Sequence, residues 1–232
     1  DREIILKNFN KKTLIAVLAV VVILAIIAIA GKNSSMKSVA NNFDLSLDKK
    51  NDEPLTDTTF ALDTFITVTI YHGGDENVLK DSLDFIRKYE MVFSATNPDA
   101  ELYKLNHRGN GVMSVKASED LAYLIDKALY YSKVSNGAFD ITTQPLKELW
   151  DFNTDDPKLP SDESIKEALP KVDYTRVSVE GDTINFTSDD TQIDLGAIAK
   201  GYIADKTKEF LKSKGVDSAI INLGGNVLCI GK

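Results

Sequence analysis

The chain has 232 residues, 43% hydrophobic and 27% charged, which is enough apolar material for one good-sized domain with a tail. Its 35 acidic residues outnumber the 27 basic ones, and the resulting net charge of -8 argues against a general nucleic-acid binder, which needs a basic face. The single cysteine, Cys229, excludes an internal disulfide, and no cysteine pair or His-x-x-x-His spacing points to a zinc site.

Residues 14–30 are apolar without interruption, and this run lies at the short end of the roughly 17 to 25 residues that span a bilayer as a helix. Three lysines lie between residues 7 and 12, so the positive-inside rule keeps the N-terminus in the cytoplasm and exports the rest. We therefore predict that residues 1–31 hold a single-pass transmembrane signal anchor of the cell membrane, followed by an extracytoplasmic domain. A cleaved signal peptide is the alternative, because Ala-Ile-Ala at 28–30 resembles a cleavage site.

Residues 32–59 are rich in Asn, Ser, Asp and Lys, and we interpret them as a flexible linker. The globular domain is then expected over residues 60–232. It opens with a predicted strand at residues 60–71, where Ile66, Val68 and Ile70 alternate with polar residues.

The remaining chain mixes helical and strand patterns. Leu79, Leu83 and Ile86 share one face of a predicted helix at residues 77–93, and Ser118 is typical of the N-cap of a second helix. Further helices are predicted at residues 145–150 and 197–214, and strands at 176–179, 183–186, 192–195, 218–222 and 227–230. Because strands and helices do not alternate regularly, we expect an α+β fold with a mixed, mostly antiparallel sheet packed with helices. We also expect the natural domain to continue past Lys232, since a sheet edge left there needs covering.

Three segments have residue types suited to ligand binding. Residues 135–152 combine glycine, acids, threonines and a proline between helical patterns. Residues 193–205 place Asp194 and Gly196 before a helix whose first amides and Lys200 can face a diphosphate. Residues 222–225, Asn-Leu-Gly-Gly, let the backbone approach a ligand closely. Each segment also has a plainer interpretation, as a helix connection, a helix start or a hairpin turn, and none is a P-loop or a dinucleotide fingerprint.

The order of these motifs is more specific than any one of them. They are Leu-Asp-Thr at 62–64, Phe-Ser at 93–94, and residues 102–106, 136–142, 145–152, 194–202 and 222–226. In this order and spacing, over residues 60–232, the chain resembles the ApbE-like family of FAD:protein FMN transferases. The resemblance implies the T-fold-like α+β domain of that family, incomplete at its C-terminus.

The resemblance also implies an activity and a set of site residues. Its members transfer FMN from FAD to a serine or threonine hydroxyl of an exported acceptor flavoprotein through a phosphoester bond, with Mg²⁺ and release of AMP. FAD contacts are implied for Leu62, Thr96, Ala138, Phe139, Asp140, Asp194 and Lys200. Ala197 is implied as a Mg²⁺ ligand through its backbone carbonyl, and the side-chain ligands are expected beyond Lys232. Leu62 stands where the family often has methionine, and Thr96 where it often has a stacking aromatic residue.

The implied chemistry matches these residue types. Splitting FAD at the FMN phosphate places negative charge on the AMP leaving group and the transferring phosphoryl group, and Mg²⁺ held by oxygen ligands offsets that charge. Two alternatives remain open. One is an FAD pyrophosphatase that gives FMN and AMP, and the other is a non-catalytic extracytoplasmic FAD-binding protein.

Overall fold

The computed structural model describes residues 53–150 and 157–231. The predicted signal anchor and the first part of the predicted linker lie outside these ranges. Within them, no helix is both long enough and apolar enough to cross a membrane.

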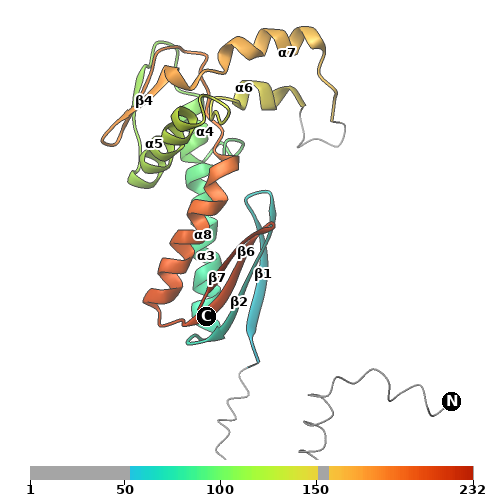
Figure 1. Ribbon diagram of the computed structural model, residues 1–232, viewed down its shortest axis with the longest axis vertical. Helices are drawn as coiled ribbons and strands as arrows, with labels where there is room; N and C mark the ends of the chain where they lie inside the picture. The colour runs from blue at the N-terminus through green and yellow to red at the C-terminus, as the bar shows by residue number, and fades with distance from the viewer. Residues whose placement is uncertain (1–52, 151–156, 232) are drawn as a thin grey trace, which may run out of the picture. The chain divides into compact units, whose positions relative to one another are not determined.

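The larger sheet has the strand order β1-β2-β6-β7, with every neighbouring pair antiparallel. Its strands are β1 (Leu55–Ala61), β2 (Thr64–His72), β6 (Ser218–Leu223) and β7 (Asn226–Ile230). One face buries Ile66, Val68 and Ile221 completely, and helices α3 (Glu76–Phe93) and α8 (Gly196–Ser213) pack against the sheet, as Figure 1 shows. The alternation of apolar and polar residues in β2 therefore has the expected cause, a strand with one buried face.

A second, smaller sheet has the order β3-β5-β4, again antiparallel throughout. Its strands are β3 (Ser114–Lys116), β4 (Val177–Glu180) and β5 (Thr183–Phe186), and helix α5 (Glu119–Val134) packs against β4. The short helical elements are α4 (Glu101–Asn106), α6 (Gln144–Lys147), η2 (Glu148–Trp150), α7 (Asp162–Ala168), η3 (Leu169–Lys171) and η4 (Tyr174–Arg176).

The α+β prediction is confirmed, and so are the two long helices: α3 begins one residue before the predicted start, and α8 spans Gly196–Ser213. Ser118 is the N-cap of α5, as predicted. Helices α4 and α7 and strand β3 were not predicted. The strand predicted at residues 192–195 is wrong, because Ile193 exchanges both backbone hydrogen bonds with the buried side-chain amide of Asn106, at 2.7 and 2.8 Å, instead of with a strand.

The first predicted strand is also corrected, because the chain reverses inside it. Ala61 pairs with Thr64, so Leu62 and Asp63 form a two-residue hairpin turn, with φ of 55° and 56°. Positive φ at both positions is what such a turn requires, although Asn-Gly is its usual sequence. β1 also begins at Leu55, so the prediction of a linker up to residue 59 is wrong for residues 55–59.

A cluster of aromatic rings lies between α3, α5 and α8. The Tyr202 hydroxyl donates to the Asp120 carboxylate at 2.5 Å, and the Tyr202 and Tyr89 ring centroids are 6.0 Å apart. Burial raises the pKa of Tyr89 from 10.0 to about 12, and the charge of Asp120 adds to the effect. Burial and the hydrogen bond to Asp120 likewise raise the pKa of Tyr202.

These raised pKa values predict a loss of stability in alkali. Above about pH 10 the unfolded tyrosines lose protons that the folded protein retains, so the free energy of unfolding should fall as the pH rises from about 10 to about 12. Urea unfolding at several pH values in this range should show a smaller fall for Tyr89→Phe, which has no titrating hydroxyl. Equal pH dependence in both proteins would contradict the assignment.

Candidate functional site

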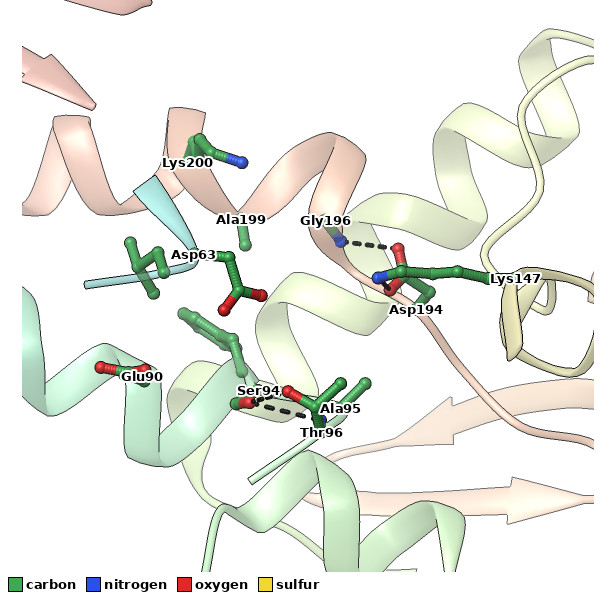
Figure 2. Close-up of a pocket in the computed structure, with 12 residues that line it drawn as sticks. Asp63, Glu90, Ser94, Ala95, Thr96, Lys147, Asp194, Gly196, Ala199 and Lys200 are labelled. Carbon is green, nitrogen blue, oxygen red and sulfur yellow. Dashed lines mark hydrogen bonds and ion pairs between the residues drawn. The ribbon is translucent and has the colours of Figure 1, made fainter. Parts of the chain in front are cut away.

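A pocket of about 270 Å³ lies between the β1–β2 turn, the end of α3 and the start of α8. Figure 2 shows the side chains that line it. They are Leu62, Asp63, Glu90, Phe93, Ser94, Ala95, Thr96, Lys147, Asp194, Gly196, Ala199 and Lys200. The pocket thus brings together four segments that are far apart in the sequence.

Asp194 organises the end of the pocket at the start of α8. Its carboxylate accepts a hydrogen bond from the Gly196 amide at 3.0 Å and forms an ion pair with the Lys147 ammonium at 2.6 Å, as Figure 2 shows. A carboxylate here satisfies one of the free amides of the helix N-terminus and is favoured by the helix dipole. The Asp194 side chain is only 15% exposed whereas that of Lys147 is 46% exposed, so the pair holds the lysine at the mouth of the pocket.

The backbone around Asp194 is fixed as well. Its amide donates to the Ile141 carbonyl at 2.7 Å, which ties the start of α8 to the segment leading into α6. A Cβ atom on Gly196 would lie 3.0 Å from Oδ1 of Asp194, so glycine gives this carboxylate the room it needs to reach the amide.

Three further charged side chains line the pocket: Asp63, Glu90 and Lys200. None of them has a hydrogen-bond or ion-pair partner among the residues that the structure describes. They are therefore the charged groups of the pocket that remain available to a ligand.

The predicted FAD contacts divide between two places. Leu62, Thr96, Asp194 and Lys200 line the pocket. Phe139 and the predicted metal ligand Ala197 instead line a separate apolar hollow of about 390 Å³. Both hollows border the first residues of α8, since Gly196 lines one and Ala197 the other.

Ala138 and Asp140 line neither hollow. Asp140 uses its carboxylate within the protein, accepting hydrogen bonds from Thr142 at 2.6 and 2.7 Å and from the Tyr174 amide at 2.9 Å. Its observed contacts thus fix the loop before α6 against η4. Its role in FAD binding remains a prediction.

Sequence reasoning missed Glu90 and Lys147 as site residues, and it included Asp63 in the Leu-Asp-Thr motif without giving it a role. Glu90 belongs to a segment whose pattern indicated only a helix. The partner of Lys147 is 47 residues away in the sequence, and no local pattern pairs the two. Only the packing of α6 near the start of α8 identifies this lysine.

The described residues do not by themselves form a magnesium site. Within residues 53–150 and 157–231, no group of three or more His, Cys, Asp or Glu side chains is placed to hold a metal ion. Ala197 offers a backbone carbonyl, and one carbonyl is far from the near-octahedral oxygen set that Mg²⁺ demands.

Comparison with known proteins identifies the domain. The model of the ApbE family matches residues 62–232. FAD:protein FMN transferases from Treponema pallidum and Klebsiella pneumoniae are 32% and 31% identical to the chain, over 66% and 69% of its length. The crystal structure of the ApbE protein from Thermotoga maritima has a TM-score of 0.71 and 28% identity, covering 77% of this chain and 59% of that one.

The chain matches only part of the length of each relative. The chain spans 44% of the Treponema protein and 51% of the Klebsiella protein, about half the length of these curated relatives. The match nevertheless includes every segment that lines the pocket, and the family model covers well over half of the chain. The chain therefore belongs to the ApbE family.

Proposed function

We propose that this domain binds FAD in the pocket at the start of α8 and transfers its FMN to a serine or threonine hydroxyl of an exported acceptor protein. The products are a phosphoester-linked flavin and AMP. The observation that carries the proposal is the make-up of the pocket, where a helix N-terminus and two lysines adjoin an apolar wall. The activity named for the curated relatives supports it.

The positive charges of the pocket suit a diphosphate. Lys200 has no partner among the described residues, and Lys147 is held at the pocket by Asp194. The start of α8 also borders the pocket through Gly196, and the helix dipole favours an anion there. Together these groups can offset the charge that develops as the diphosphate is split.

The apolar part of the lining suits the flavin ring. Leu62 and Phe93 offer apolar surface, and Thr96 adds a small hydroxyl where a larger aromatic residue would narrow the space. A volume of about 270 Å³ is near the lower limit for ligand pockets, so we assign it to the flavin and its phosphate rather than to the whole dinucleotide.

In the proposed reaction the acceptor hydroxyl oxygen bonds to the phosphorus of the FMN unit. The bond from that phosphorus to the bridging oxygen breaks, and the oxygen leaves with AMP. The family resemblance further implies a requirement for Mg²⁺, which lowers the charge of the diphosphate when bound. Ala197 is the residue of this chain that we assign to the metal, through its carbonyl.

We also propose where the protein acts. The apolar run at residues 14–30, with lysines before it, supports an anchor in the cell membrane and an extracytoplasmic domain. The acidic net charge of -8 argues against nucleic acid as the partner.

The test is flavin transfer by the complete gene product, including any sequence that continues past Lys232. It is incubated with FAD, Mg²⁺ and exported proteins of the same cell, and the denatured proteins are separated and examined for flavin fluorescence. A fluorescent acceptor band that requires Mg²⁺ and FAD is expected. AMP release without a labelled protein would favour the pyrophosphatase alternative, and the absence of both would favour a binding protein.

A matched pair of lysine variants localises the activity. Lys200→Met should lower the transfer rate at least about ten-fold, because it removes the unpaired cation and keeps a long apolar stem. Lys208→Met, two turns further along α8 and outside the pocket, is the control and should transfer at the normal rate. Equal rates for the two variants would contradict the assignment of the diphosphate to this pocket.

A further inference from the structure

The β1–β2 turn places two unusual residues at the rim of the pocket. Leu62 and Asp63 both have left-handed backbone conformations, with φ of 55° and 56°. That conformation is unfavourable for L-residues other than glycine, least so for aspartate and asparagine, and a bulky residue such as leucine is a clear outlier. Both side chains line the pocket. An unfavourable backbone at a ligand-binding rim indicates a functional constraint on the residues that occupy it.

The packing behind the turn explains how the strained conformation persists. Thr64 follows the turn and lies against Gly224, where an added Cβ would be 2.3 Å from the Thr64 hydroxyl oxygen. The Gly224 amide also donates to the Phe65 carbonyl at 3.1 Å. The β6–β7 hairpin, whose turn contains Gly224, therefore holds the β1–β2 turn in place, and the Asp63 side chain extends from a fixed backbone.

The surroundings of the Asp63 carboxylate define what it can do. Figure 2 shows it in the middle of the pocket, between the start of α8 and residues 94–96. It has no hydrogen-bond or ion-pair partner among the described residues, unlike Asp194, whose oxygens are used by Gly196 and Lys147. An ionised carboxylate only accepts hydrogen bonds, and it repels a diphosphate. Among the groups of the proposed substrates, the one that suits it is therefore a hydrogen-bond donor on an uncharged part.

We propose that Asp63 accepts a hydrogen bond from an aliphatic hydroxyl of the substrates, an inference that rests on the proposed function. Two hydroxyl sources meet at this site: the ribityl chain of the flavin and the serine or threonine of the acceptor. If the hydroxyl belongs to the ribityl chain, Asp63 is a specificity residue that recognises the sugar-alcohol part of FAD. If the hydroxyl belongs to the acceptor, Asp63 takes its proton while the hydroxyl oxygen bonds to the phosphorus of the FMN unit. The bridging oxygen of the diphosphate then leaves with AMP.

The test uses Asp63→Asn in the full chain, with riboflavin, lumiflavin and FAD as probes. Asparagine tolerates the left-handed conformation, so the turn keeps its shape and only the charge is lost. Riboflavin carries the ribityl hydroxyls without phosphate, and lumiflavin has the ring without hydroxyls, so repulsion from a diphosphate does not affect either. Asp57→Asn is the matched control, because Asp57 is an exposed acid of the same hairpin that does not line the pocket.

If the hydroxyl belongs to the ribityl chain, Asp63→Asn should bind riboflavin about 10- to 100-fold more weakly and should bind lumiflavin normally. Asp57→Asn should bind both flavins as the unaltered protein does. If the hydroxyl belongs to the acceptor, both flavins should bind Asp63→Asn as they bind the unaltered protein. Acceptor-dependent AMP release should then fall roughly 100-fold or more. The inference is overturned if binding and AMP release are both unchanged, or if lumiflavin binding weakens as much as riboflavin binding. If the unaltered protein binds neither riboflavin nor FAD, the proposed function itself fails, and this inference with it.

Discussion

Replacing Gly224 by alanine is expected to destabilise the domain by about 2–4 kcal/mol and to disrupt flavin binding at the same time. Gly224 has a φ of 61°, and an added Cβ would lie 2.3 Å from the Thr64 hydroxyl oxygen and 2.8 Å from its Cβ. Because one of these atoms is the Thr64 Cβ, rotation of the threonine cannot relieve the clash, and the two hairpins must separate. The change reaches the pocket because Thr64 follows Asp63 directly.

Two variants make this prediction specific. Gly225→Ala changes the next residue of the same turn, which has a φ of 94° and no atom within 4 Å of an added Cβ, so it should show only backbone strain of about 1–2 kcal/mol. Adding Thr64→Gly to Gly224→Ala removes the clashing atoms and should restore flavin affinity while backbone strain remains. Urea unfolding and fluorescence titration with riboflavin measure both effects. Equal losses for Gly224→Ala and Gly225→Ala would refute the steric explanation.

Removing the Asp194 carboxylate is expected to reduce transfer from FAD by about 100-fold, with only a modest loss of stability. Asp194→Ala loses the bond to the Gly196 amide and releases Lys147 into solvent, so the pocket loses both a fixed helix start and a positioned cation. Loss of one hydrogen bond to a helix amide costs about 1 kcal/mol, and the ion pair adds little, because Lys147 is nearly half exposed. We therefore expect the kinetic effect to exceed the effect on folding.

The contribution of Lys147 can be separated with a double-mutant cycle. Asp194→Asn keeps an oxygen for the Gly196 amide and removes only the charge, so it should retain stability and lose transfer activity. If the ion pair positions Lys147, adding Lys147→Met to Asp194→Asn should cost little more than either change alone. The rates of AMP release by the unaltered protein, the two single variants and the double variant give the coupling energy between Asp194 and Lys147 directly. Full additivity, or normal transfer by Asp194→Asn, would show that the pair has no part in the reaction.

The elements predicted well are those in which the local pattern and the tertiary contacts agree. The stripe of Leu79, Leu83 and Ile86 gives α3 its buried face, and the caps at Asp75 and Ser118 start their helices as such residues usually do. The strand predicted at residues 192–195 failed because its hydrogen-bond partner is a side chain, that of Asn106, 87 residues away. Sequence periodicity cannot identify a hydrogen-bond partner that is a distant side chain.

The hairpin turn was missed for a related reason. Leu-Asp is not a typical turn sequence, so the apolar alternation seemed to run through it, and only the pairing of Ala61 with Thr64 identifies the reversal. The same limit applies to the pocket. Motif order identified Leu62, Thr96, Asp194 and Lys200 as site candidates. Lys147 became a candidate only through its ion pair with Asp194, and Asp63, which lies within the Leu-Asp-Thr motif, received a role only from its position in the pocket.

The strand order of the larger sheet has a consequence for how the chain folds. β2 pairs with β6, so that Ile66 lies opposite Leu223, near the other end of the described chain. Closing such a long loop is costly in chain entropy, and domains with a high contact order fold slowly. The edge of β2 that pairs with β6 must therefore stay open until the last strands have been made, although α3 can already pack against the hairpin. An unpaired strand edge is open to chaperones and to aggregation, so this edge is exposed before the pocket exists.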